Sequence, residues 1–221
     1  MNAENGSCAT LSTLSTYKYG TPQVDKRYAI NFFSDTLRVD GKVVYLSNGE
    51  PLVYRPLEVA LSLTGSKYEK TAGARMAKDE IDRTAHDDGR LQDNDIVLFR
   101  YADVLLMKAE AEYRLGNHAA ALTLVNQIRD RAHATLRTSL NLNDILDERM
   151  IELAWEGVRR QDQIRFCTFT QPTADRYPGV SHNASAGDYL DDTQGYTCVY
   201  PIPYEVLNLN KNLHQNPGYK K

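Results

Sequence analysis

Apolar side chains recur at helical spacing in the second half of the chain and not in the first. The first regular stripe predicts a helix that begins near Asp95 and ends before Gly116, a residue type that commonly follows a helix end. A second stripe follows Asn117, whose side chain can accept hydrogen bonds from first-turn amides. A tight turn between two such helices predicts an antiparallel hairpin. The stripes comprise Leu98, Ala102, Leu105, Leu106, Ala109 and Tyr113, and then Ala121, Leu122, Val125, Ile128 and Ala132.

A third amphipathic segment predicts a helix from Asn143 to about Gly157. The pattern is helical again from Arg159 to Phe166, and a short helix is expected near Tyr204 to Leu209. These elements predict helix pairs in the general style of tetratricopeptide units. The buried face expected for the third helix comprises Leu146, Met150, Leu153 and Ala154.

The sequence before residue 95 has little helical periodicity. Two short apolar runs, 28–33 and 42–46, predict strands, and the glycines and prolines around them predict loops. A second long irregular stretch is expected from Cys167 to Val199, which also holds several glycines and prolines. The prediction is therefore a mainly α fold with at most a few short strands, with an irregular, loop-rich part at 1–94 and a helical domain at 95–221.

Charge and composition exclude several classes of function. The 221 residues include 26 basic and 29 acidic side chains, and no basic block stands out, so a nucleic-acid footprint is absent. No apolar run approaches the roughly 20 residues that a membrane-spanning helix needs. The three cysteines and five histidines lack the spacing of metal sites, and no phosphate-binding glycine loop occurs. We therefore expect no cofactor and no metal.

The third predicted helix carries charged side chains at contact spacing. Glu152 lies three residues after Arg149, and Arg160 lies four residues after Glu156. Glu152 and Glu156 are one turn apart, about 6 Å at Cβ, which would also suit the two carboxylates of a glycosidase. The neighbouring arginines would lower the pKa of both glutamates, whereas the acid of such a pair needs a raised pKa. We favour a structural ion-pair network, and expect no catalytic residue and no enzyme.

Tyrosine is the abundant aromatic residue, with fourteen copies against one Trp and five Phe. Aromatic faces with a polar rim hold neutral sugars and peptides without chemistry. Tyr17 and Tyr19, in the irregular part, are the candidate ligand-binding residues. For any single tyrosine, a place at the edge of the core is the alternative. Trp155, on the packed third helix, is expected to make a core or hairpin contact and not to serve as a ligand platform.

Four sequence blocks occur in order over residues 95–219, and together they are specific. They are the run Arg100–Ala111, the segment Asn126–Ala132, the charged helix within Leu146–Arg165, and the C-terminal pieces Tyr200–Pro203 and Gln215–Tyr219. In these blocks the chain resembles the C-terminal part of the RagB/SusD family of nutrient-binding proteins. Before residue 95 only short echoes occur, such as Asp25-x-Arg27.

The resemblance implies an all-helical, SusD-like fold with tetratricopeptide-like pairs, on which irregular loops build the ligand surface. It implies noncovalent binding of an oligosaccharide or a peptide, without enzymatic activity. It also implies a place at the outer-membrane surface of Bacteroidetes-type bacteria, and delivery of the nutrient to a SusC-like TonB-dependent transporter.

The departures from the family pattern leave several points open. Family members are usually more than twice this length and begin with a lipoprotein signal, which Met1–Ser7 does not resemble. We therefore expect either a fragment or an abbreviated product. The matching blocks are scaffold blocks, so the resemblance assigns no ligand-binding residue. A helical-repeat module that docks proteins and binds no small ligand is the alternative, with its pairs at 95–133 and 143–166.

Overall fold

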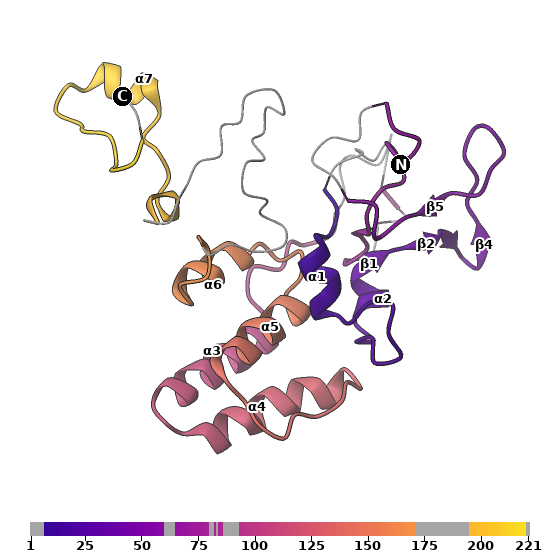
Figure 1. Ribbon diagram of the computed structural model, residues 1–221, viewed down its shortest axis with the longest axis horizontal. Helices are drawn as coiled ribbons and strands as arrows, with labels where there is room; N and C mark the ends of the chain where they lie inside the picture. The colour runs from indigo at the N-terminus through magenta and orange to yellow at the C-terminus, as the bar shows by residue number, and fades with distance from the viewer. Residues whose placement is uncertain are drawn as a thin grey trace. The chain divides into compact units, whose positions relative to one another are not determined.

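The computed structural model describes residues 7–59, 65–79, 82, 84–85, 93–170 and 195–219. The chain divides into two units, Met1–Arg159 and Arg160–Lys221, and the first extends across residue 94, where the sequence suggested a boundary. Regular structure is mainly helical and each strand has two residues (Figure 1). The predicted fold class is confirmed. In the described ranges, none of the helices is long and apolar enough to cross a membrane.

The described residues up to 79 form two short helices and three antiparallel strand pairs: β1 with β6, β2 with β5 and β3 with β4. Tyr28–Asn31, predicted as part of a strand, is helical instead, because the Asn31 amide donates to the Arg27 carbonyl. The strand predicted at 42–46 is present in its first two residues. The elements are α1 (Leu11–Thr16), α2 (Tyr28–Asn31), β1 (Phe32–Phe33), β2 (Asp35–Thr36), β3 (Arg38–Val39), β4 (Lys42–Val43), β5 (Val53–Tyr54) and β6 (Arg75–Met76).

Helices α3 (Tyr101–Arg114) and α4 (His118–Arg131) form the predicted antiparallel hairpin (Figure 1). Gly116 has a φ of 87°, and its amide donates to the Tyr113 carbonyl, so a left-handed residue ends α3 as predicted. Most of the predicted inner stripes are confirmed. Their buried members are Ala102, Leu105, Leu106 and Ala109 of α3, and Ala121, Val125 and Ile128 of α4.

Helix α3 begins at Tyr101 and not near Asp95, as the sequence had suggested. The preceding Arg100 has extended backbone, with φ −142° and ψ 161°. Its side chain is held by Glu152, the last residue of α5 (Leu142–Glu152), and by Glu156 beyond that helix. Arg100 therefore stays outside helical geometry, and the helix begins at the next residue. Leu98 was predicted on the buried face and is 78% exposed. That prediction is wrong because residues 96–99 precede the helix.

Asn117 and Asn141 each precede a helix, and only Asn141 forms a side-chain N-cap. The cap predicted for Asn117 is wrong, because its side-chain amide donates to Glu112 Oε2 at 2.7 Å and accepts nothing from α4. Asn141 caps α5 (Leu142–Glu152): its Oδ1 accepts from the Asp144 amide at 2.9 Å, and Asp144 Oδ2 accepts from the Asn141 amide at 2.9 Å. Such a reciprocal pair satisfies two donors at a helix start.

Helix α5 ends at Glu152 and not near Gly157, because the backbone turns left-handed at Trp155, with φ 68°. The Trp155 ring packs edge-to-face on Phe32, with centroids 5.7 Å apart. Its Nε1 donates to the Asn31 carbonyl at 3.0 Å. The core contact predicted for Trp155 is confirmed. On α5 and after it, Leu146, Met150 and Leu153 are buried as predicted, and Ala154 is partly buried.

An aromatic core joins α1 and α2 to the end of α5. The Tyr17 ring meets Phe32 edge-to-face at 5.3 Å, and Tyr28 stacks on Phe32 at 5.2 Å. Such pairs add to the burial of their apolar area. The buried members of this core are Ala9, Leu14, Tyr17, Tyr28, Phe32, Ala74 and Ile151. Cys8, Cys167 and Cys198 are free thiols.

The second unit holds most of α6 (Arg159–Arg165), a 3-10 turn η1 (Tyr196–Cys198) and α7 (Tyr204–Leu209). The short helix predicted near Tyr204 to Leu209 is confirmed. Gln215 fixes the segment before α7, since its side chain exchanges two hydrogen bonds with the backbone of Ile202, at 2.8 and 2.9 Å. Most of the irregular stretch predicted from Cys167 to Val199 lies outside the described residues.

Candidate functional site

The charged residues of α5 and its C-terminal flank lie in a buried network, which we call the charge clamp. Glu148 is fully buried, and Glu152 is 4% exposed. Their partners come from segments far away in the sequence and not from the same helix. The charge clamp comprises Asp25, Arg27, Lys78, Arg100, Arg129, Arg131, Glu148, Glu152 and Glu156.

Arg27 is the centre of the clamp on the side of α2. Its Nη2 donates to Glu148 Oε1 at 2.8 Å and to Asp25 Oδ2 at 2.8 Å. Its Nη1 donates to Glu152 Oε2 at 2.9 Å. One guanidinium thus ties the loop before α2 to two turns of α5, which is the planar, multidentate geometry that arginine favours.

Arg100 is the centre on the side of α3. Its Nη1 donates to Glu152 Oε1 at 2.6 Å, and its Nε donates to Glu156 Oε2 at 2.8 Å. Lys78 also pairs with Glu156, and its Nζ donates to the Glu152 carbonyl at 2.7 Å. Three chain segments that are distant in sequence therefore meet at the end of α5.

The structural network predicted for this helix exists, but its pairing was predicted wrongly. Arg149 pairs with Asp103 of α3, with Nη1 and Oδ1 2.8 Å apart, and not with Glu152. Glu156 pairs with Lys78 and Arg100 and not with Arg160. Sequence spacing finds neighbours along one helix, whereas these carboxylates point toward other elements.

Electrostatics argue against acid–base chemistry at these glutamates. Burial alone would raise the pKa of Glu152, but hydrogen bonds from Arg100 and Arg27 outweigh burial and hold the pKa below its ordinary value. The same balance, with hydrogen bonds from Arg100 and Lys78, lowers the pKa of Glu156. A glycosidase acid needs a raised pKa, so neither side chain suits that role.

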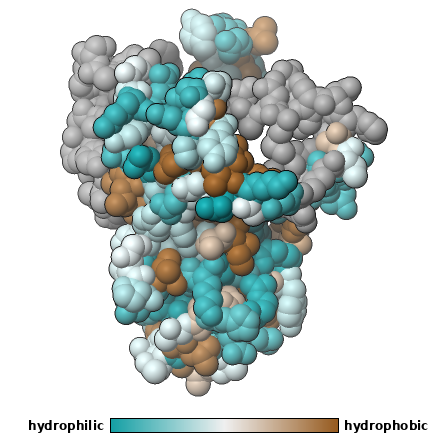
Figure 2. Space-filling model, turned by 90° about the vertical axis from the view of Figure 1, so that its right-hand side faces the viewer, coloured by the Kyte–Doolittle hydropathy of each residue, from teal (hydrophilic) through white to brown (hydrophobic). Residues whose placement is uncertain are grey.

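An open hollow of about 500 Å³ lies beside the clamp. Residues 16–18 and 22–26, around the α1–α2 loop, line one side, and residues 129 and 133–137, at the end of α4, line the other. Figure 1 shows this loop and the C-terminal end of α4 next to one another. The volume is in the range of small-ligand sites. On the face drawn in Figure 2, hydrophobic side chains form separate patches between hydrophilic ones.

The α4 side of the hollow is fixed by hydrogen bonds of the backbone. His133 has a φ of 52°, and its amide donates to the Asp130 carbonyl at 2.9 Å. The Ala134 amide donates to the Arg129 carbonyl at 2.8 Å, which completes a Schellman helix ending. Asn126 then holds the next turn, because its side chain exchanges two hydrogen bonds with the Arg137 backbone, at 2.8 and 2.9 Å.

The α1 side ends in the same way. Lys18 has a φ of 56°, and its amide donates to the Ser15 carbonyl at 2.9 Å. The Tyr19 amide donates to the Leu14 carbonyl at 2.9 Å, a second Schellman ending. The Asp25 amide closes the loop on the Tyr17 carbonyl at 2.9 Å. Both sides of the hollow are therefore built on ordered turns.

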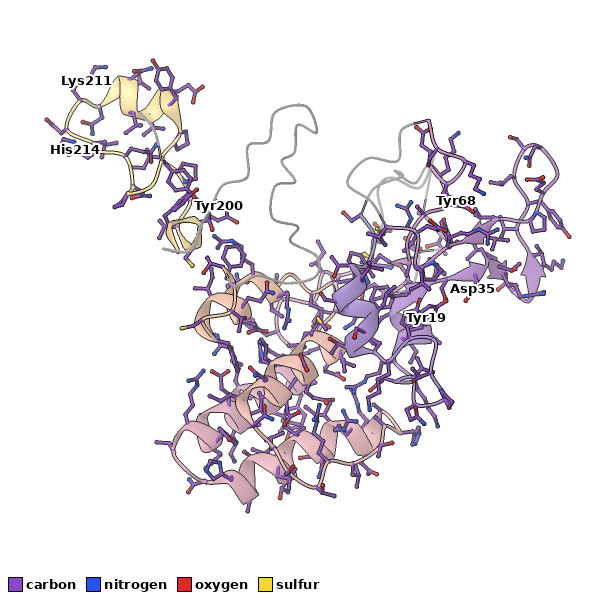
Figure 3. All side chains as sticks on the ribbon, viewed as in Figure 1. Tyr19, Asp35, Tyr68, Tyr200, Lys211 and His214 are labelled. Carbon is purple, nitrogen blue, oxygen red and sulfur yellow. The ribbon has the colours of Figure 1, made fainter. Side chains whose placement is uncertain are left out.

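The two candidate tyrosines lie in different surroundings. Tyr17 has no exposed surface, and its hydroxyl donates to the Ile151 carbonyl at 2.7 Å, so it supports the bottom of the hollow. Tyr19 is partly exposed and lies near Asp35 of β2, as Figure 3 shows. Its ring packs on Tyr28, with centroids 4.8 Å apart. Direct ligand contact stays a prediction for both, and the exposed ring of Tyr19 suits it better.

The basic residues that line the hollow were not among the predicted ligand-binding residues. They are Lys18, Lys26, Arg129 and Arg137. They are spread along the chain, and the two sides of the hollow come from distant parts of the sequence. The signal that could have indicated part of the arrangement is Asp25-x-Arg27, because Arg27 pairs with Asp25 and with Glu148 of α5 and so brings the loop to that helix.

Comparisons with known proteins agree on one family. The model of the SusD family matches residues 22–219. The starch-binding protein SusD of Bacteroides thetaiotaomicron is 36% identical over 131 residues, which cover 58% of this chain and 22% of that protein. The SusD-like protein P38 of Formosa agariphila is 44% identical over 145 residues, which cover 58% of this chain and 25% of that protein. The chain thus spans about a quarter of the length of these relatives.

Solved structures show the same fold. A SusD superfamily protein from Bacteroides fragilis superposes with a TM-score of 0.57 at 22% identity, covering 94% of this chain and 40% of that one. A SusD superfamily protein from Bacteroides vulgatus superposes with a TM-score of 0.56 at 22% identity, covering 95% and 44%.

Proposed function

Because the chain belongs to the SusD family, we propose that it binds an oligosaccharide without chemical change and delivers it to a SusC-like TonB-dependent transporter. SusD family members are binding proteins and not enzymes. One similar protein is named for starch binding, which supports a sugar as the ligand here. A peptide is the other nutrient class that the proposal admits.

One observation carries this proposal: paired, buried carboxylates lie beside an open hollow. The glutamates that could have done chemistry are engaged in the charge clamp, where Glu148 and Glu152 each bind two or more cationic side chains. The hollow next to them is open and rimmed by polar groups. A site that offers hydrogen bonds and shape without an activated acid or nucleophile captures a ligand and does not cleave it.

The hollow supplies the polar contacts, and we assign the stacking contact to Tyr19. A partly exposed ring beside a carboxylate, here Asp35, can cover a sugar face while the carboxylate accepts from its hydroxyls. Such open sites reach affinities of only about micromolar to millimolar.

The cellular place and the partner follow from the family and are part of the same proposal. The chain would act at the outer-membrane surface of a Bacteroidetes-type bacterium, against a SusC-like transporter. Affinity capture of that transporter with the tagged chain from a detergent extract would support this. A control chain with several exposed residues substituted should capture less transporter. Equal capture by that control would contradict the proposal.

Binding itself is tested by isothermal titration calorimetry with a panel of oligosaccharides and peptides. We expect one class to bind and no product to form. Tyr19→Ala should weaken binding about tenfold, because stacking contributes about 1 kcal/mol or more. Tyr45→Ala, which changes an exposed ring elsewhere on the irregular part, should change nothing. Binding of no oligosaccharide or peptide, or turnover of any of them, would contradict the proposal.

A second function, docking of a protein partner without a small ligand, is favoured by one observation. The residues before α3 and on its outer face are apolar and open to solvent, with Ile96 at 87% and Phe99 at 80% exposure. Exposed apolar patches of this kind commonly mark interaction sites. If Phe99→Ser abolishes transporter capture while no sugar or peptide binds the unmodified chain, this second function is the better description.

A further inference from the structure

The charge balance around the hollow is opposite in sign to that of the chain. The whole sequence has 26 basic and 29 acidic residues, for a net charge of −3. Among the residues that line the hollow, four are basic and one, Asp25, is acidic. The basic residues are Lys18, Lys26, Arg129 and Arg137. A local reversal of this kind attracts anions.

Ion pairs within the protein neutralise some of the charges around the hollow, and the remaining positive charges can bind a ligand. Arg27 neutralises Asp25, with Nη2 and Oδ2 2.8 Å apart. Arg137 pairs with Asp144. Lys18 and Lys26 are exposed, and neither has an ion-pair partner among the residues that the structure describes.

Arg129 adds an ordered guanidinium to this side of the clamp. Its side chain is only 12% exposed and is held by two contacts. Nη1 donates to Glu148 Oε2 at 2.5 Å, and Nε donates to the Thr135 carbonyl at 2.7 Å. Within the described residues, Nη2 makes no hydrogen bond to the protein. A preordered arginine with a free N–H edge suits a planar or tetrahedral oxyanion.

Two of the residues that line the hollow have a left-handed backbone, which fixes where their side chains start. Lys18 and His133 each occupy the left-handed position that ends a helix, where glycine is strongly favoured. Both line the hollow, from opposite sides. A side chain at such a position costs some backbone strain, as it also does at Trp155, whose ring packs in the core. A cation and an imidazole thus stand where folding alone would favour glycine.

We propose that the hollow binds an anionic oligosaccharide, whose carboxylate or sulfate groups are held by Lys18, Lys26 and the free edge of Arg129. His133 donates a further hydrogen bond from the α4 side. This inference rests on the proposed function and specifies its ligand class. Carboxylates and sulfates share the oxyanion chemistry that the site recognises, and they differ in shape and charge.

The test is calorimetric titration of the full chain with three oligosaccharides of equal length. One carries carboxylates (an oligogalacturonate), one carries sulfate esters (a sulfated galactan), and one is neutral (a malto-oligosaccharide). We expect at least one anionic sugar to bind about tenfold or more tightly than the neutral one. That preference should shrink as salt rises from about 50 to 500 mM, because the two lysines are exposed to solvent.

Two double variants locate the site. Lys18→Gln with Lys26→Gln should weaken binding of the anionic sugar about tenfold and bring it near the neutral one. Lys42→Gln with Lys70→Gln removes the same net charge from exposed positions outside the hollow, and should leave affinity within about twofold. If both double variants lose the same affinity for the anionic sugar, the effect comes from net charge and not from the hollow, and the proposed site is wrong.

A single variant separates the folding role of Lys18 from its binding role. Lys18→Gly should relieve the left-handed strain and raise the melting temperature by about 2–4 °C, while weakening binding of the anionic sugar by part of the loss expected for the Lys18→Gln, Lys26→Gln double variant. A higher melting temperature with unchanged affinity would show that Lys18 does not touch the ligand, and would overturn the proposal.

The outcomes distinguish this inference from the function on which it rests. If neutral and anionic sugars bind equally, the ligand class is wrong while the nutrient-binding function stands. If no sugar or peptide binds, the proposed function fails, and this inference fails with it. If inorganic sulfate competes as well as the sulfated sugar on a molar basis, the site holds only a free anion, and the oligosaccharide assignment is overturned.

Discussion

The charge clamp and the hollow are built from the same residue types on neighbouring elements, yet they have opposite environments. Arg27 and Lys26 are adjacent in sequence; Arg27 is 6% exposed with three carboxylate partners, while Lys26 is exposed with no ion pair among the described residues. A buried charge must be matched, because leaving it unpaired costs several kcal/mol. An exposed charge carries no such penalty and stays available to a ligand.

This contrast separates the structural role of a charged side chain from its binding role. In the clamp, removal of one partner should damage the fold. At Lys18 and Lys26, which line the hollow and lie outside the clamp, removal of the charge should damage binding and spare the fold.

Acid should produce the largest loss of stability. The pKa values of Asp25, Glu152 and Glu156 lie below their ordinary values, because hydrogen bonds and charges of basic neighbours outweigh burial. Each carboxylate therefore contributes stability that is fully present above its unfolded pKa, about 4, and is lost as pH falls through its lower folded pKa. We expect the melting temperature, followed by circular dichroism, to fall by roughly 10 °C or more between pH 6 and 3. A flat profile would contradict the clamp.

Removal of one clamp carboxylate should have the next largest effect. Glu152→Ala removes a carboxylate that Arg27 and Arg100 share and leaves the buried clamp with excess positive charge, so it should lower the free energy of unfolding in urea by about 3–5 kcal/mol. Glu58→Ala changes an exposed glutamate and should stay within about 0.5 kcal/mol. If the two variants lose the same small amount, the network is a surface feature.

Tyr17→Phe should have a moderate effect that is confined to stability. The hydroxyl donates to the Ile151 carbonyl and accepts from Asn31 Nδ2 at 2.8 Å, so its loss should cost about 1–2 kcal/mol. Sugar affinity should be unchanged, because the group is buried. Unchanged stability with lost binding would instead place Tyr17 in the ligand site.

Asp147→Asn should have the smallest effect, with the opposite sign. Burial raises the pKa of Asp147 despite the neighbouring Arg159, so its ionised form is disfavoured in the folded state at neutral pH. The amide removes that penalty and should raise the free energy of unfolding by about 0.5 kcal/mol at pH 7. The gain should vanish below about pH 4, where aspartate is itself protonated. A loss of stability at pH 7 would contradict this assignment.

The helical part of the fold could be predicted because its signals are local. The stripes of α3 and α4 follow the helical period, and Gly116 marks the turn between them. The predicted helix ends were wrong where a contact with a distant part of the chain determines the backbone conformation. Arg100 is extended because its side chain reaches Glu152 and Glu156, and Trp155 leaves the helix to pack on Phe32.

The site was less predictable for the same reason. The charges of α5 were recognised as a network, but Arg27 and Arg100 lie far from Glu152 in sequence, so spacing along one helix assigned the wrong partners. Nothing local marks Lys18 or His133 either. Their shared feature, a left-handed backbone at a helix end, is a property of the folded chain.

Stability and affinity measured together on Glu152→Gln test the central claim most directly. This variant keeps the shape of the side chain and removes its charge. If Glu152 belongs to the architecture, the melting temperature falls by several degrees, the folded protein binds its sugar with an affinity within about twofold of the unmodified chain, and neither protein releases product. An unchanged melting temperature together with lost binding, or with lost turnover, would contradict the account.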